Sequence, residues 1–243
     1  MLVLDNVSKR YGNLEAVSNL SLHIKEGEFF GFLGPNGAGK TTTVRMLAGL
    51  ARPTAGRVLV CGHDMARETI EAKRLIGLVP DRPFLYTRLR GEEFLNFAAD
   101  LYGVDGAERR ERIEHFLKLF RLRDWRHELI EAYSHGMRQK LVFAAALLHR
   151  PRALVVDEPL VGLDPEGITI VKRLMGEHCE RGGTVFMSTH SLEVVEALCS
   201  RIGIIHHGKL IAEGTVAEVK ALAKAPSPAL ESAFLTLTRE EAD

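Results

Sequence analysis

At residues 34–41 the chain reads Gly34-Pro35-Asn36-Gly37-Ala38-Gly39-Lys40-Thr41, which matches every fixed position of the phosphate-binding template G-x-x-x-x-G-K-S/T. The apolar run 29–33 precedes this loop and predicts a buried strand, and residues 42–48 follow it with a helical pattern. The glycines let the backbone wrap tightly, so that successive N–H groups and the positive end of the helix dipole face the same phosphate. We therefore predict a phosphate site in which Lys40 reaches the terminal phosphates and the Thr41 hydroxyl ligates Mg²⁺.

Composition narrows the class of protein. The chain has 243 residues, enough for a large core, and its 32 Lys plus Arg are balanced by 32 Asp plus Glu. This balance gives no domain-wide basic footprint, so we expect no nucleic-acid partner. Cys61, Cys179 and Cys199 stand far apart without a C-x-x-C pair, which indicates reduced thiols in a cytosolic protein rather than disulfides or a zinc site. Residues 1–5 do not read as a signal peptide, and the longest apolar run, 141–148, is too short to span a bilayer.

Two kinds of strand pattern are present. Apolar residues alternate within 2–7, 20–24 and 58–60, which predicts an N-terminal antiparallel β layer beside the phosphate-binding loop. Continuous apolar runs predict central strands of a parallel sheet. These runs are residues 153–156, 184–188 and 202–205. Helical patterns separate the runs, so the predicted fold class is α/β with a mainly parallel sheet.

Between residues 84 and 150 the apolar spacing becomes helical, which predicts a helical subdomain inserted in the α/β core. The residues that carry this spacing are Phe94, Phe97, Ala98, Leu101, Ile113, Phe116, Leu117 and Phe120. Further on, residues 223–229 contain two prolines and predict a linker, and 230–237 predict a short docked helix. We therefore expect one main domain over 1–222, followed by a linker and a C-terminal helix over 223–243.

An apolar strand pattern ends in two carboxylates, Asp157 and Glu158. In open α/β sheets ligands bind outside the carboxyl ends of the strands. In enzymes with a phosphate-binding loop the strand-end aspartate supports Mg²⁺, a role that fits Asp157. Glu158 is one residue further on and is placed to orient or deprotonate an attacking water.

Three further motifs complete an ordered series. Ser134-His135-Gly136 precedes an apolar helix, whose N-terminus is an anion site that Ser134 would cap, although by itself this pattern favours a capped helix that binds nothing. Gly162-Leu163-Asp164-Pro165 and Ser188-Thr189-His190 follow the two carboxylates. The order of these motifs resembles that of the ATP-binding subunits of ABC transporters, over roughly residues 2–220.

This resemblance implies a role for each matching residue. ATP would be bound, with adenine on the tyrosine, by Tyr11, Gly34, Pro35, Asn36, Gly37, Ala38, Gly39, Lys40, Thr41 and Thr42. Glu158 and His190 would be catalytic, and Mg²⁺ would lie among Thr41, Asp81 and Asp157. Ser134, His135, Gly136 and Asp164 would act on the ATP of the opposite subunit, because the family works as a head-to-tail dimer with two ATPs between its subunits. Closing this dimer would move a separate membrane permease.

The chain departs from the family pattern at three places. Its signature segment, residues 133–137, reads Tyr-Ser-His-Gly-Met instead of Leu-Ser-Gly-Gly-Gln and so lacks the glutamine. Asp81 stands where the family has a magnesium-contacting glutamine, which adds negative charge near ATP. Val161 replaces a small polar residue before Gly162.

We interpret the chain as the ATPase of a transporter, most like drug or small-molecule exporters, held at the cytoplasmic face of the membrane by its permease. The alternative is an ABC ATPase that acts on nucleic acid or ribosomes, but such relatives carry tandem cassettes or a long coiled coil, and this chain has one phosphate-binding loop without sustained heptads. A catalytically inactive module is disfavoured by Lys40, Asp157, Glu158 and His190. The apolar residues 84–86 are expected either to receive a short helix of the permease or to belong to the core.

Overall fold

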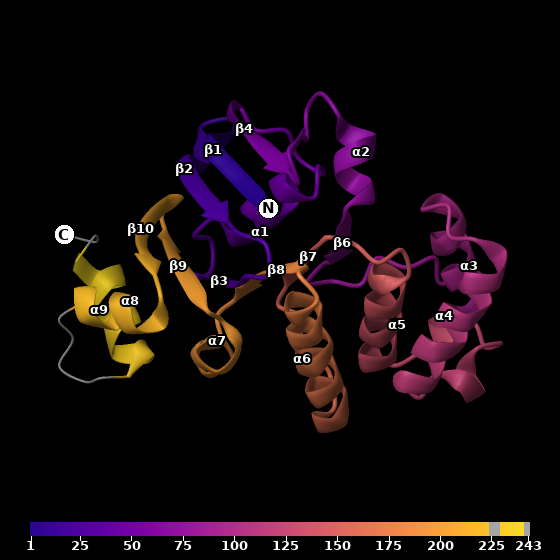
Figure 1. Cartoon of the computed structure of the whole chain (residues 1–243). Coiled ribbons are helices and arrows are strands. Elements are labelled where there is room, and N and C mark those ends of the chain that lie inside the picture. Colours follow the sequence, from indigo (N-terminus) through magenta and orange to yellow (C-terminus); the bar gives the residue numbers. More distant parts are fainter. Residues whose placement is uncertain (224–228, 241–243) are drawn as a thin grey trace.

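The computed structural model describes residues 1–223 and 229–240 and has a six-stranded sheet at its centre (Figure 1). Its strand order is β10-β9-β3-β8-β7-β6, and every neighbouring pair is parallel except β9 with β10. The strands are β3 (Phe29–Leu33), β6 (Ile76–Val79), β7 (Ala153–Asp157), β8 (Thr184–Thr189), β9 (Arg201–His206) and β10 (Lys209–Gly214). The predicted mainly parallel sheet is confirmed, and the three apolar runs are β7, β8 and β9.

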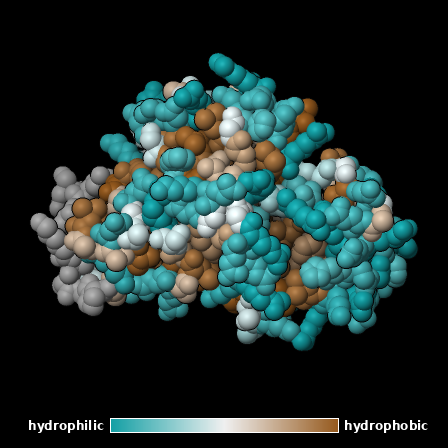
Figure 2. Space-filling view, in the orientation of Figure 1, coloured by the Kyte–Doolittle hydropathy of each residue, from teal (hydrophilic) through white to brown (hydrophobic). Residues whose placement is uncertain are grey.

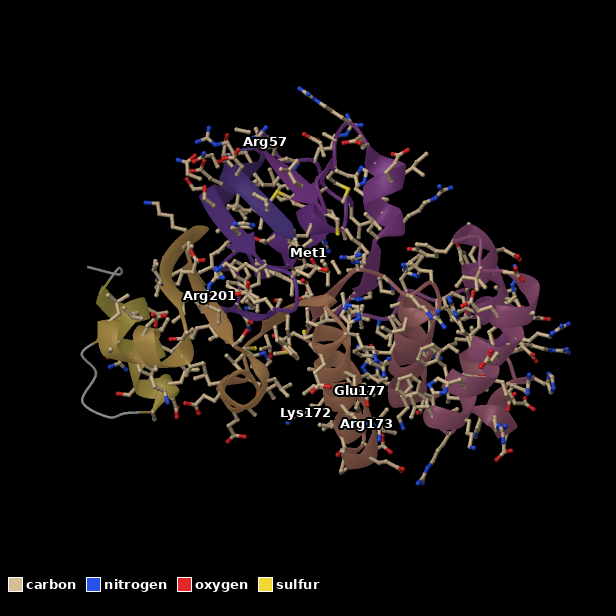
Figure 3. The ribbon with its side chains drawn as sticks, in the orientation of Figure 1. Met1, Arg57, Lys172, Arg173, Glu177 and Arg201 are labelled. Atoms are coloured by element: carbon tan, nitrogen blue, oxygen red, sulfur yellow. The ribbon has the colours of Figure 1, made fainter. Side chains whose placement is uncertain are left out.

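A second, antiparallel sheet lies over one face of the first and has the order β2-β1-β4-β5 (Figure 1). Its strands are β1 (Leu2–Tyr11), β2 (Leu14–Ile24), β4 (Ala55–Val60) and β5 (His63–Asp64). The predicted N-terminal antiparallel layer is therefore confirmed. Arg201 of β9, labelled in Figure 3, joins the two sheets, because its guanidinium pairs with Glu28 over 2.6 Å and also donates to the carbonyl of His23 at the end of β2.

The central strands alternate their side chains between two apolar cores. Phe30 and Phe32 of β3 face the antiparallel layer and lie against Phe186 of β8, with ring centroids 6.0 and 5.3 Å apart. Phe29 and Leu33 of the same strand belong to the other core, which is covered by helices. Because the central strands are buried on both faces, their sequences are continuously apolar rather than alternating.

Helices cover both faces of the central sheet. Helix α1 (Lys40–Leu47) and the short α2 (Thr69–Arg74) lie on the side of the antiparallel layer. Helices α6 (Pro165–Glu180) and α7 (Leu192–Leu198) pack on the opposite side, below the sheet in Figure 1. The central sheet is therefore covered on both faces.

The region expected to be helical contains α3 (Gly91–Leu101), α4 (Gly106–Leu119) and α5 (His135–Leu147), with short 3₁₀ turns at Arg123–Trp125 and Ile130–Ala132. The face predicted for α3 is partly wrong. Phe97 and Leu101 are exposed, whereas Leu95 and Ala99 are fully buried. Small residues let α3 approach its neighbouring helices, and Phe97 instead meets Tyr86 edge-on at 5.6 Å at the surface. Figure 2 shows a mostly hydrophilic surface over α3 and α4.

The C-terminal part contains α8 (Val216–Leu222) and α9 (Leu230–Glu240), and α9 packs against α7 and α8. The helix expected at 230–237 is thus present as α9, with Leu230 and Ala233 buried. Most of the predicted linker, residues 224–228, lies outside the described residues. None of the helices within residues 1–223 and 229–240 combines the length and hydrophobicity that crossing a bilayer requires.

Candidate nucleotide-binding site

The candidate residues for the phosphates, the magnesium ion and catalysis follow four neighbouring strands of the central sheet. The phosphate-binding loop follows β3, and the segments with the other candidates follow β8, β7 and β6, which lie beside it in that order. The register sets Leu33 beside Thr189 and Asp157 beside Ser188. Because the carboxyl ends of parallel strands meet at one edge of a sheet, the strand order brings these segments together.

The phosphate-binding loop, residues 34–41, is shaped by close backbone packing. Gly39 has φ 112°, and a Cβ atom there would lie 2.5 Å from the carbonyl oxygen of Ala16 on β2, so the position requires glycine. Helix α1 begins at the next residue, Lys40, and its first N–H groups have no helical acceptors. Free donors at a helix N-terminus favour the binding of an anion.

Lys40 is buried in this loop. Its ammonium group donates to the carbonyls of Gly34 and Pro35 over 2.7 and 3.1 Å. Burial lowers the pKa of the Lys40 ammonium, and the nearby carboxylates of Glu158 and Asp157 oppose this shift. The Lys40 ammonium is thus held by the loop, near the carboxylates of Asp157 and Glu158.

Asp157 is buried at the end of β7. Burial raises the pKa of its carboxyl, the hydroxyls of Ser188 and Thr41 oppose this shift, and the carboxylates of Asp81 and Glu158 add to it. Thr41 and Asp81 thus lie near enough to Asp157 to affect the pKa of its carboxyl, and the binding of Mg²⁺ by these three residues stays a prediction.

These groups fit Mg²⁺. Carboxylate and hydroxyl oxygens are the hard donors that this ion prefers. Within the described part of the chain, no three His, Cys, Asp or Glu side chains gather closely enough to hold a metal by themselves. Mg²⁺ usually uses one or two protein carboxylates together with substrate phosphates and water, so the donor set suits an ion that arrives with a nucleotide.

Glu158 has an unusual backbone conformation, and both oxygens of its carboxylate accept hydrogen bonds. Its φ of 48° is rare for a non-glycine residue, and its N–H donates to the Ser188 carbonyl over 2.8 Å. Its Oε1 accepts from the ring Nδ1 and the backbone N–H of His190, over 2.7 and 3.0 Å. Its Oε2 accepts from the Thr189 hydroxyl over 3.0 Å. The candidate base is therefore held in one orientation while remaining 15% exposed.

The signature segment, residues 133–137, forms the start of α5. The Ser134 hydroxyl accepts from the Met137 N–H over 3.2 Å, which confirms the predicted N-cap. A Cβ atom added to Gly136 would lie 2.8 Å from the Gly162 carbonyl, and one added to Gly162 would meet the His135 ring at 2.1 Å. His135 and Gly136 are thus packed against the segment that carries Asp164.

Asp164 caps helix α6 by accepting from the Gly167 N–H over 3.2 Å, and it also pairs with Lys140 of α5 over 2.7 Å. The Lys140 ammonium is the first cause of the lowered pKa of the Asp164 carboxyl. The four residues expected to act in trans, Ser134, His135, Gly136 and Asp164, therefore form a second cluster, at the N-termini of α5 and α6 rather than in the phosphate-binding loop.

Tyr11 ends β1, in the hairpin whose second strand contacts the phosphate-binding loop through Ala16. Its ring is 45% exposed and lies under the Lys9 ammonium at 4.9 Å. An exposed ring at this place is available to stack on a base.

Two residues that contact the candidates carry no role in the sequence motifs. Thr189 touches Glu158, and Lys140 pairs with Asp164. Their signals in the sequence were weak, since each is only a polar neighbour of a motif.

Comparison with known proteins identifies the family. Residues 17–161 match the family model described as ABC transporter, and the chain belongs to this family as an ATP-binding, ATP-hydrolysing subunit. A linearmycin resistance ATP-binding protein of Bacillus subtilis is 40% identical over 88% of this chain and 69% of its own length. A bacitracin transport ATP-binding protein of Bacillus licheniformis is 40% identical over 86% of this chain and 67% of its own length.

Solved structures agree with this assignment. An ATP-binding subunit of an ABC transporter superposes with a TM-score of 0.93, at 31% identity, over 98% of this chain and 99% of that one. A dimeric ATP-binding cassette bound to ADP and Pi superposes with a TM-score of 0.80, at 29% identity, over 88% of this chain and 98% of that one. The predicted ABC ATPase fold is confirmed, and the alternative of a nucleic-acid or ribosome ATPase finds no support in these matches.

Proposed function

We propose that this chain binds Mg-ATP in a head-to-tail dimer and uses its hydrolysis to drive a separate membrane permease that exports small molecules. The observation that carries the proposal is the position of Glu158, whose carboxylate is held by His190 and Thr189 beside Lys40 and Asp157. Phosphoryl transfer to water needs a placed carboxylate, a lysine on the phosphates and a metal ligand at one sheet edge. Glu158, Lys40 and Asp157 would fill these three roles.

Two copies would form each site. The phosphate-binding loop of one copy would face Ser134, His135, Gly136 and Asp164 of the other, whose helix N-termini supply donors and positive dipole ends to the γ-phosphate. The solved dimeric cassette named above supports this arrangement. We assign the ATPase to residues 1–222, with residues 223–243 as an appended segment.

Export is supported by the names of the relatives, which include linearmycin resistance, bacitracin transport and daunorubicin resistance proteins. Substrate choice would lie with the permease. The permease would also hold the chain at the cytoplasmic face of the membrane.

The permease would dock beside the segment 84–86. Phe84 is 86% exposed and Tyr86 is 55% exposed, so the core interpretation is wrong for both. Leu85 between them is half-buried against the helical core. Tyr86 and Phe97 extend the apolar surface across α3, which suits a short amphipathic helix of the permease.

The purified chain tests this function through Mg²⁺-dependent release of phosphate from ATP. Glu158→Gln keeps the shape of the side chain but removes the base, so we expect turnover to fall about 10²- to 10⁴-fold while ATP still binds. Lys40→Ala should weaken ATP binding by about 10- to 100-fold, since a charge-assisted hydrogen bond is lost. Glu180→Gln, an exposed glutamate at the end of α6, is the matched control. Unchanged turnover in Glu158→Gln, with only monomers in Mg-ATP, would refute the proposal.

A further inference from the structure

We propose that Thr189 is a positioning residue for ATP hydrolysis, whose hydroxyl holds the carboxylate of Glu158 in the orientation that activates water. The inference rests on the proposed role of Glu158 as the catalytic carboxylate. It concerns a residue that touches the base rather than the substrate.

The Thr189 hydroxyl has both of its hydrogen-bonding roles defined. It accepts from the Ser191 N–H over 3.1 Å and donates to Glu158 Oε2 over 3.0 Å, and the residue is only 3% exposed. The Ser191 N–H can only donate and the carboxylate can only accept, so the single proton of the hydroxyl is directed at the carboxylate. Burial keeps water from replacing the contact.

The place of Thr189 in the fold makes it a rigid anchor. It is the last residue of β8 and pairs in register with Leu33 at the end of β3, directly before the phosphate-binding loop. Glu158 follows β7, which is the neighbour of β8 on the other side. The hydroxyl therefore joins the candidate base to β8, the strand that lies between β3 and β7.

Thr189 and His190 hold different oxygens of the same carboxylate. Oε1 accepts from His190 and Oε2 accepts from Thr189, so rotation of the carboxylate breaks contacts on both sides. If the ring of His190 turns to the γ-phosphate, the backbone N–H of His190 and the Thr189 hydroxyl still hold one oxygen each. The second lone pair of Oε2 then remains available to accept a proton from water.

The test compares Thr189→Val, which removes the hydroxyl with little change of shape, with Thr189→Ser, which keeps it. We expect kcat for ATP to fall about 10- to 100-fold in Thr189→Val with KM changed less than about 2-fold, because only the placement of the base is lost. Thr189→Ser should recover kcat to within a few-fold of the unmodified chain. A rise in KM together with the fall in kcat, or a failure of serine to restore kcat, would indicate a structural role and overturn the inference.

A double-mutant cycle separates this inference from the function on which it rests. In the Glu158→Gln background, single-turnover hydrolysis should be no slower with Thr189→Val than without it, since no base is left to position. An equal fold-loss in both backgrounds would refute the coupling. If Glu158→Gln alone hydrolyses ATP normally, the proposed function fails instead, whatever Thr189 does.

Thr184→Val provides the matched control. Thr184 is a buried threonine on the same strand, and its hydroxyl donates to the Lys25 carbonyl over 2.8 Å, away from the site. We expect it to lower stability but leave kcat unchanged. Circular dichroism shows whether Thr189→Val folds. If it does not, Thr189→Ala replaces it in the double-mutant cycle, and the same results support or overturn the inference.

Discussion

The ring Nδ1 of His190 lies 2.7 Å from Oε1 of Glu158, and the backbone N–H of the same histidine reaches the same oxygen over 3.0 Å. Since a carboxylate only accepts hydrogen bonds, Nδ1 carries the proton and Nε2 is left with a free lone pair or a second proton. The side chain is 66% exposed, so Nε2 is open to a ligand. The ring can leave Glu158 without loss of the backbone contact.

His190→Ala should therefore reduce hydrolysis more than binding. We expect single-turnover hydrolysis to fall about 100-fold or more, while ATP affinity falls at most about 10-fold, because the ring contributes one contact among many donors to the phosphates. Equilibrium binding of a fluorescent ATP analogue and quenched-flow hydrolysis measure the two effects. His115→Ala, an exposed histidine on α4, serves as the control. Equal losses of affinity and rate would show that the ring only binds.

Composite sites predict a specific result for mixed subunits. One copy carries Lys40→Ala and the other carries Ser134→Ala, so a mixed dimer has one doubly altered site and one intact site. ATPase activity of the mixture should exceed that of either variant alone, because only mixing restores an intact site. The measurement is activity against mixing ratio at fixed total protein. Activity equal to the average of the two variants, without a dimer at any concentration, would contradict the composite site.

The exposed segment 84–86 predicts different outcomes for neighbouring residues. Phe84→Glu should abolish co-purification with the permease without loss of folding or ATP binding, because its side chain is 86% exposed. Leu85→Glu should instead destabilise the chain, since it places a charge against the helical core. Thermal unfolding and pull-down separate the two effects. Leu222→Glu, which alters an exposed leucine on α8, is the control, and retained co-purification of Phe84→Glu would place docking elsewhere.

His149 predicts a pH dependence of stability. Its Nε2 lies 3.0 Å from the Ile76 carbonyl, and its ring stacks on Tyr102 at 3.7 Å. Burial lowers the pKa of His149 from 6.5 to about 4. Between these two values the unfolded chain binds a proton at His149 and the folded chain does not. The contribution of neutral His149 to the free energy of unfolding is therefore present above pH 6.5 and is lost as the pH falls toward about 4.

His149→Gln should remove that dependence while retaining a donor to Ile76. Relative to pH 7, the unmodified chain should lose about 2 kcal/mol more stability at pH 5 than the variant does. Urea unfolding at the two pH values measures this difference. As a control, His115→Gln, which alters an exposed histidine, should leave the loss of stability between pH 7 and pH 5 unchanged. A variant that loses as much stability as the unmodified chain would assign the acid sensitivity to other groups.

Local sequence determined the elements and the motifs of this protein. The loop at 34–41 matches its template residue by residue, and the central strands are recognisable as continuous apolar runs. The N-cap of α5 at Ser134 is also a local property, since the hydroxyl bonds a backbone group three residues on. Such features depend on neighbours in the chain and can be seen in it.

Only the tertiary structure decided which side chains meet. The Thr189 hydroxyl at the end of β8 contacts the Glu158 carboxylate, which follows the neighbouring strand β7. The Lys140 ammonium of α5 contacts Asp164 at the start of α6. On α3, Leu95 rather than Phe97 faces the core. These contacts depend on the order of strands in the sheet and on how closely the helices pack. Neither is encoded in local spacing, because residues distant in sequence are brought together only when the whole core is buried.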